Sequence, residues 1–295
     1  MTMKTALSIV QNYRYLMALD APSSLLSLTD PDELQQLQFL YKVSQELRRE
    51  GPFRQQIATH EFDTASGTNT YPLPGDFYSA MSDTYYNQDN DWTLIGPVSD
   101  SEFLAYKEGS LGTPSEYVWR VVGFDENSLS TEGRQLELYP TPGATENLSF
   151  QYVSSHLFVP PNWAASTIYT SGQFVTVNGR IYQCDTGGTS SSTPPSGTDN
   201  DQTDGTATWD YYNSSYDIVQ HAGDRCIFDA ELVELGLRAY HKLEKQKDPS
   251  EMGEFRKAIM ASLFRWEGQT RARGDKGGSA NTRRYFVPPN SWSIV

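Results

Sequence analysis

The stretch of residues 163–212 constrains the fold most, because it has the composition of a small, self-closed unit placed inside a larger host domain. It contains few aliphatic residues and several aromatic ones. The Asn178-Gly179 pair predicts a tight turn between two short strand-like runs, Phe174–Val177 and Ile181–Cys184. We therefore expect an inserted all-β module, in a chain that presents a surface rather than one that encloses a small substrate.

Helical patterns occur towards both ends of the chain. Apolar residues recur at helical spacing over residues 4–19, and the helix-start sequence Asp30–Glu33 leads into a second helix that stops at Gly51-Pro52. Two more helices are predicted, over Asp224–Lys247 and from Glu251 to about Arg271. Neither pair buries its apolar stripe alone, so we expect the N- and C-terminal helices to pack together as a bundle.

Residues 51–162 have the composition of strands and turns. Tyr117–Gly123 is rich in β-branched and aromatic residues. Gln135–Tyr139 and Leu148–Val153 alternate polar and apolar residues, and we expect them to form an antiparallel hairpin. A short helix is predicted over Glu102–Lys107. This part of the chain has four basic and fifteen acidic residues, which indicates either a solvated acidic surface or a negative wall along which a polyanion slides without sticking.

The fold class that follows is α+β, with a helical bundle formed by the N- and C-terminal helices, a β-rich domain and a small inserted all-β module. We divide the chain into five segments: 1–50 as the N-terminal helices of the bundle, 51–162 as the β-rich domain, 163–213 as the inserted module, 214–272 as the C-terminal helices of the bundle, and 273–295 as an extended C-terminal docking tail.

Charge is unevenly distributed along the chain. The net charge is −14 and the pI is about 4.7, which argues against a general DNA-binding or anionic-membrane protein. Between Arg265 and Arg284, however, the sequence has six basic residues and only two acidic ones. We expect this tail to dock onto an acidic, grooved protein partner rather than onto DNA, because the chain ends in apolar and aromatic residues. The docking residues are Arg271, Arg273, Lys276, Arg283, Arg284, Tyr285, Phe286 and Trp292.

Motifs for catalysis and metal binding are lacking. The four histidines are scattered, and no pair has the spacing of a metal site: His60, His156, His221 and His241. The sequence contains no nucleophile elbow, phosphate-binding loop or dinucleotide-binding fingerprint. We expect no catalytic residue, no metal and no cofactor. A hydrolase remains a third hypothesis with no specific motif in its favour.

The cysteines and the N-terminus indicate where the chain folds. Cys184 and Cys226 are expected to be free thiols in a reducing compartment. The N-terminus does not have the pattern of a signal peptide, because Gln11, Asn12 and Arg14 interrupt its apolar residues. No run approaches the roughly 20 apolar residues of a membrane helix. We expect a soluble chain without a membrane partner.

The order of these elements resembles the head-to-tail adaptor proteins of short-tailed bacteriophages, which lie beneath the portal ring. The resemblance is carried by the two early helices, the turn-rich corner Tyr71–Phe77, the strands within 135–153, the helix pair within 224–271 and the basic tail. It implies a ring of about twelve copies whose tails insert into the portal protein, around a lumen through which DNA passes without sequence-specific binding. The other implied partners are tail nozzle, hub or fibre proteins. The implied location is the head–tail junction of the virion, after synthesis in the host cytoplasm.

Residues 163–212 resemble small chitin-binding-type carbohydrate-binding modules. The shared pattern is carried by Trp163, Tyr169, Gly172, Val175, Gly179, Tyr182, Cys184 and Trp209. In such modules exposed aromatic side chains stack on sugar rings, so the resemblance implies that Trp163, Tyr169, Tyr182 and Trp209 contact carbohydrate or a tail protein. A simpler explanation of these four residues is that so short a segment has little else from which to build a core.

Two hypotheses about function follow. The first is a structural virion protein without enzymatic activity: a head-to-tail adaptor ring that joins the portal to the tail and forms part of the DNA ejection channel. The second, from a different class, is a carbohydrate- or receptor-binding virion protein that acts through residues 163–213.

Overall fold

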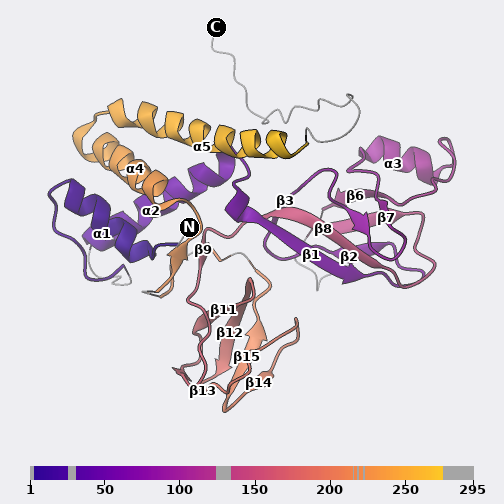
Figure 1. Ribbon diagram of the computed structural model, residues 1–295, viewed down its shortest axis with the longest axis horizontal. Coiled ribbons are helices and arrows are strands. Elements are labelled where there is room, and N and C mark those ends of the chain that lie inside the picture. The colour runs from indigo at the N-terminus through magenta and orange to yellow at the C-terminus, as the bar shows by residue number, and fades with distance from the viewer. Residues whose placement is uncertain are drawn as a thin grey trace, which may run out of the picture. The chain divides into compact units, whose positions relative to one another are not determined.

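The computed structural model describes residues 3–25, 31–123, 134–214, 216–217, 219–221 and 223–274. The chain divides into two compact units. The helical unit comprises Met1–Gln55, His156–Tyr212 and Tyr216–Val295, and the sheet unit comprises Gln56–Ser155 and Asn213–Ser215. Helices and antiparallel sheets both occur (Figure 1). The predicted α+β class is therefore confirmed.

The first two helices of the helical unit lie where the apolar periodicity predicts them. α1 (Ala6–Leu16) begins at Thr5, whose hydroxyl accepts a hydrogen bond from the Ser8 amide at 3.2 Å. α2 (Pro31–Glu50) has acidic residues in its first turn and basic residues in its last turn, which complement the helix dipole. Local signals thus account for both helices.

The third predicted helix starts later than the sequence indicates. α4 (Ala230–His241) begins at Asp229, whose Oδ1 accepts a hydrogen bond from the Glu231 amide at 2.9 Å. The residues before this cap are not helical, because β16 (Arg225–Cys226) pairs with β9 (Phe158–Val159). The predicted start at residue 224 is therefore wrong, since a distant strand engages the backbone there.

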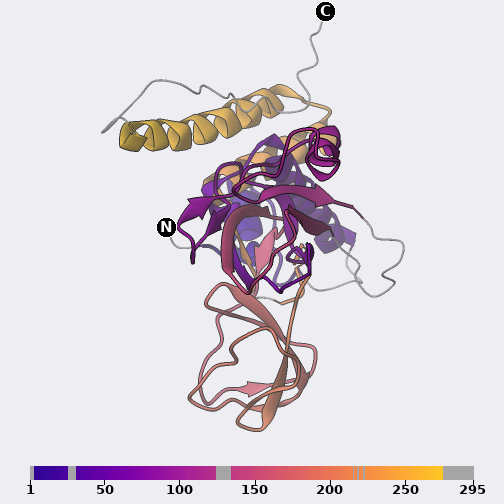
Figure 2. The same cartoon turned by 90° about the vertical axis from the view of Figure 1, so that its right-hand side faces the viewer.

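The last helix follows a local irregularity. A π-helical turn, η2 (Lys242–Gln246), and the left-handed residue Lys247 separate α4 from α5 (Ser250–Gly274). α5 is one unbroken helix in both views (Figures 1 and 2). Its side chains are described as far as Leu263.

One apolar core contains side chains from helices at both ends of the chain. α4 packs against α1, α2 and α5. Tyr13 and Leu40 from the early helices and Phe255 from α5 are all fully buried. Gly236 allows a close approach in α4, because a Cβ atom there would lie 2.7 Å from Val43 Cγ1 and 2.8 Å from Phe255 Cζ. The early helices therefore depend on the late ones for burial of their apolar faces.

Residues 163–212 contribute a four-stranded antiparallel sheet in the order β11-β12-β15-β14 and a two-stranded ribbon of β10 and β13 (Figure 1). The strands are β10 (Ile168–Tyr169), β11 (Phe174–Val177), β12 (Arg180–Thr186), β13 (Gly188–Thr189), β14 (Gln202–Asp204) and β15 (Ala207–Tyr211). The predicted Asn178-Gly179 turn is confirmed, because both residues have a positive φ, 49° and 83°, between the paired strands β11 and β12. Phe174 and Ile181 belong to the apolar core of the helical unit.

The sheet unit contains two antiparallel sheets. One has the order β1-β8-β4-β5, with β3 also paired to β8, and the other has the order β2-β7-β6. The elements are η1 (Arg54–Gln56), β1 (Ile57–Asp63), β2 (Thr70–Pro72), β3 (Phe77–Ala80), β4 (Tyr86–Asn87), β5 (Trp92–Thr93), α3 (Asp100–Lys107), β6 (Val118–Val122), β7 (Gln135–Tyr139) and β8 (Asn147–Ser154). Tyr85 stacks on Trp119 and on Phe150, with ring centroids 3.6 and 4.5 Å apart, in the core of this unit.

The predicted hairpin of Gln135–Tyr139 with Leu148–Val153 is wrong. These residues form β7 and most of β8, which belong to different sheets. β8 pairs instead with β1, from Ile57 opposite Val153 to Asp63 opposite Asn147. The connection between β7 and β8 contains two prolines and is longer than the two-residue loops that hold adjacent strands together. Pairing between distant strands therefore decides the topology.

Candidate functional site

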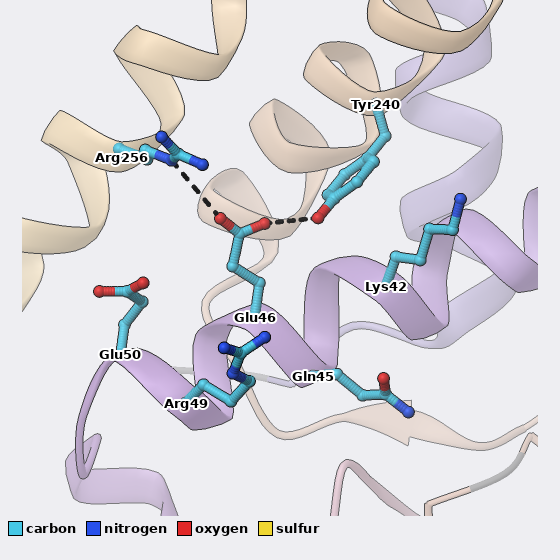
Figure 3. Close-up of a pocket in the computed structure, with 7 residues that line it drawn as sticks. All are labelled: Lys42, Gln45, Glu46, Arg49, Glu50, Tyr240 and Arg256. Carbon is cyan, nitrogen blue, oxygen red and sulfur yellow. Dashed lines mark hydrogen bonds and ion pairs between the residues drawn. The ribbon is translucent and has the colours of Figure 1, made fainter. Parts of the chain in front are cut away.

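The helical unit has an open groove of about 480 Å³ between α2, α4 and α5 (Figure 3). It is lined by Lys42, Gln45, Glu46, Arg49, Glu50, Tyr240 and Arg256. The five residues from α2 lie along one face of that helix, and every lining side chain ends in a polar group. Such a groove suits a polar or charged segment of another chain better than an apolar small molecule.

Glu46 lies at the centre of the groove and connects its three helices. Its Oε2 accepts a hydrogen bond from the Tyr240 hydroxyl at 2.6 Å, and its Oε1 lies 3.7 Å from Arg256 Nε (Figure 3). Burial raises the pKa of Tyr240, and the Glu46 carboxylate raises it further. The hydroxyl therefore stays protonated and acts as a hydrogen-bond donor rather than as a base.

The cations around the groove are engaged to different extents. Lys42 Nζ lies 3.0 Å from Glu244 Oε1, and this hydrogen bond lowers the pKa of Glu244. Arg256 has a side chain that is 70% exposed. Arg49 is exposed, and no hydrogen bond or ion pair joins it to the other labelled side chains in Figure 3. The rim of the groove thus offers positive charge to a partner, while Glu46 serves contacts within the unit.

Sequence reasoning did not predict this groove. The sequence pattern places its α2 residues and Tyr240 in predicted helices and indicates no contact between them. They meet Arg256 because α4 and α5 pack beside α2. The four-residue spacings within α2, of Lys42 with Glu46, Gln45 with Arg49 and Glu46 with Glu50, are the local signal of a shared helical face.

The four aromatic residues assigned to carbohydrate or protein contact lie together in one cluster. Tyr182 and Trp209 are buried, with exposed fractions of 1% and 0%, whereas Trp163 and Tyr169 are partly buried. Tyr169 and Trp209 pack edge to face with ring centroids 4.9 Å apart. The structure therefore brings the predicted set together, and buries two of its members.

Asp204 holds this cluster together, and sequence reasoning missed it. The residue is 2% exposed. Its Oδ2 accepts hydrogen bonds from the indole N–H groups of Trp163 at 2.7 Å and Trp209 at 3.1 Å, and its Oδ1 accepts one from the Ser191 amide at 2.6 Å. An Asp-Gly pair is typical of an exposed turn, so no local pattern indicates a buried carboxylate at this position.

The sheet unit contains a partly buried ionic cluster. Glu137 accepts hydrogen bonds from Lys107 at 2.8 Å and from Arg120 at 2.6 and 2.9 Å. Arg120 also reaches Asp100 at 3.0 Å, and its guanidinium carbon lies 4.5 Å from the centre of the Phe103 ring. Burial alone would raise the pKa of Glu137, but the hydrogen bonds from Lys107 and Arg120 outweigh burial and lower it. These contacts fasten α3 to β6 and β7.

The predicted docking tail lies almost wholly outside the described residues. Arg271 and Arg273 fall within the backbone of α5, and the structure does not describe their side chains. The other docking residues lie beyond residue 274: Lys276, Arg283, Arg284, Tyr285, Phe286 and Trp292. Their role as a docking surface stays a prediction.

The chemistry of the remaining candidate residues can be stated for the described ranges. No group of three or more His, Cys, Asp or Glu residues there is arranged to hold a metal ion. Cys184 and Cys226 are buried free thiols, as predicted, and burial raises the pKa of Cys226 to about 12. Among the helices of the described residues, none combines the length and apolar character needed to cross a membrane.

These features define a protein whose described polar clusters stabilise its own fold and whose helical unit has an open polar groove. The model of one protein family, the SU10 adaptor protein, matches residues 4–215. That match covers most of the chain, so the chain belongs to the SU10 adaptor family, whose members are structural proteins of bacteriophages. Membership supports the predicted role as a phage adaptor and a component of the virion. No curated protein sequence matches the chain.

Proposed function

We propose that copies of this chain form a ring at the head–tail junction, join the portal protein to the tail, and enclose part of the DNA channel. Membership of the SU10 adaptor family is the observation that carries this proposal. A ring of about twelve copies requires head-to-tail contacts, in which one surface of a copy meets a different surface of the next. In this arrangement the helices from both ends of the chain form a bundle that serves as the scaffold, and residues 163–213 are an inserted module on its surface.

The charge of the sheet region supports a role beside DNA. Residues 51–162 have four basic and fifteen acidic residues. A negative wall repels a polyanion and therefore lets it pass without being held. DNA is then cargo that moves through the lumen, and no sequence-specific contact is needed.

The C-terminal tail, residues 273–295, is the proposed attachment to the portal. Basic residues in its first half favour an acidic groove, and Trp292 near its end supplies an apolar anchor. The residues proposed to contact the portal are Arg271, Arg273, Lys276, Arg283, Arg284, Tyr285, Phe286 and Trp292. Tail nozzle, hub or fibre proteins would contact the opposite end of the ring.

The test uses the full-length chain and purified portal rings. Particle mass and electron cryo-microscopy of the mixture should give a ring of adaptor copies bound to each portal. Replacement of residues 275–295 by a Gly/Ser sequence of equal length should abolish portal binding while the helical signal in circular dichroism stays unchanged. Undiminished portal binding by that variant contradicts the docking role of the tail.

Carbohydrate binding through residues 163–213 is the second candidate, because Trp163 and Tyr169 keep part of their surface exposed. Binding of the full chain to chitin oligosaccharides should then be lost in Tyr169→Ala. Ile168, which is 77% exposed beside it, provides the matched control: Ile168→Ala should leave sugar binding intact. Equal binding by both variants would rule out stacking at this position.

A further inference from the structure

β1 lies at the edge of its sheet. It pairs with β8 along its whole length, and the two strands run side by side in Figure 1. Within the residues that the structure describes, no strand pairs with the other side of β1. A strand of this length with an unpaired side is a template for an added strand.

The outward side of β1 can be identified from the ladder. The Thr64 amide donates to the Glu146 carbonyl at 2.9 Å, which continues the register of Asp63 opposite Asn147. Because hydrogen-bonded positions alternate in an antiparallel pair, the even-numbered residues of β1 bond to β8. The backbone N–H and C=O groups of Ile57, Thr59, Glu61 and Asp63 therefore point away from β8, towards the free edge.

The two faces of β1 differ in chemistry. Thr59, Glu61 and Asp63 are exposed on one face. Phe62 and Ala58, on the other face, pack against the apolar core of the sheet unit. An added strand would therefore need a basic side chain on one face and apolar side chains on the other.

Residues 283–287 of the chain read Arg-Arg-Tyr-Phe-Val and are followed by Pro288-Pro289. Alternation places Arg284 on one face and Tyr285 with Val287 on the other, which meets this requirement at three of the five positions. Tyr, Phe and Val favour strands, and a proline ends strand pairing. Eight residues, 275–282, separate residues 283–287 from the described end of α5, and an extended chain of that length spans at most about 30 Å.

We propose that residues 283–287 of one copy add a strand to the free edge of β1 in the neighbouring copy of the ring. This inference rests on the proposed ring and adds a contact between its copies. Arg284 and Phe286 lie on the face of Glu61 and Asp63, and Arg283, Tyr285 and Val287 lie on the face of Phe62. The contact is head-to-tail, which is the type that closes a ring. In the assembled ring this pairing takes Arg283, Arg284, Tyr285 and Phe286 out of the proposed portal contact, which is then made by the tail residues on either side of them, Lys276 and Trp292 among them.

Disulfide cross-linking between two full-length variants tests the pairing. Both native cysteines are buried, so a Thr59→Cys variant has one accessible thiol. It is mixed, with and without portal rings, with tagged chains that carry Arg284→Cys, Tyr285→Cys or Phe286→Cys. Because strand residues alternate between faces, we expect cross-links from positions 284 and 286 and about fivefold less from position 285. Equal yields at the three positions, or cross-links only within one copy, would overturn the proposal.

Charge reversal tests the same contact without changing its geometry. In the pair Thr59→Cys and Phe286→Cys, adding Glu61→Lys should lower the cross-link yield severalfold, and adding Arg284→Glu as well should restore it. Glu108→Lys, at an exposed acidic residue just after α3, is the matched control and should leave the yield unchanged. An equal loss with Glu108→Lys would show a general charge effect and contradict strand pairing.

Portal binding by the same proteins separates this inference from the proposed function. If the native chain binds portal rings but the variants show no alternation in cross-linking, the strand contact is wrong and the adaptor role stands. If the cross-links alternate while no variant or native chain binds the portal, the strand contact stands and the portal role is wrong.

Discussion

Substitution of Asp204 by alanine should destabilise residues 163–212 without unfolding the rest of the chain. The change removes one buried carboxylate that accepts three hydrogen bonds, from Trp163, Trp209 and the Ser191 amide. Of these donors, only the Trp209 side chain is fully buried. Trp163 and Ser191 are partly exposed and regain water as a partner.

The magnitude follows from this difference in exposure. A buried donor left without a partner costs about 1–3 kcal/mol, and a hydrogen bond to a charged acceptor contributes about 1.5–3 kcal/mol. Because the two partly exposed donors can bond to water instead, we expect the free energy of unfolding of residues 163–212 to fall by roughly 3–5 kcal/mol. Asp204→Asn keeps one acceptor oxygen, so its effect should be about half as large.

Hydrogen exchange is the suitable assay, because β14, β15 and α4 belong to the same unit and only a residue-resolved measurement separates local opening of the strands from unfolding of the helices. Amides of β14 and β15 should exchange about 100-fold faster or more in Asp204→Ala, whereas amides of α4 should be unaffected. Asp185→Ala is the control, since Asp185 is exposed and its carboxylate accepts a bond from the adjacent Thr186 hydroxyl. If the exchange rates of the β14 and β15 amides change by less than about threefold in Asp204→Ala, the assignment of Asp204 as the residue that holds this cluster is refuted.

Three further predictions concern the two cores. Gly236→Ala should lower the melting temperature of the helical unit, because the new methyl group meets Val43 and overpacking costs about 1–3 kcal/mol; Gly253→Ala, with open space around it, should raise it slightly. Glu137 has a lowered pKa, so its contribution to the free energy of unfolding is complete above about pH 4.5 and is lost as the pH falls through the lowered value. Acid unfolding of Glu137→Gln should lack this pH dependence. Burial is the main cause and nearby cations a smaller cause of a pKa of His241 below 6.5, so stability should fall as the pH drops from 6.5 towards the lowered value. The melting temperature of His241→Gln should depend less on pH over this range.

The positions of α1 and α2 could be predicted from the sequence because the signals that set them are local. Acidic residues begin α2 and Gly51-Pro52 follows its end. The Asn178-Gly179 turn was predictable for the same reason, since two adjacent residues fix its backbone. Each of these features depends on residues within a few positions of one another.

Strand partners and the groove could not be predicted, because they depend on contacts between distant segments. β8 alternates polar and apolar residues whichever strand it pairs with, so its alternation does not identify β1 as the partner. Asp204 resembles a surface residue until Trp163 is placed beside it. Arg256 and Glu46 are 210 positions apart and meet only when α5 packs near α2.

The shared core of early and late helices affects how the protein is made. α2 ends at Glu50, and α4, which helps to bury it, begins at Ala230. At about 5–20 residues per second, a ribosome needs roughly 10–40 s to cover that interval. During this time Tyr13, Leu40 and their apolar neighbours lack the helix that covers them in the finished chain. Production of the adaptor in an infected cell therefore requires that this nascent segment be shielded from aggregation until synthesis passes α4.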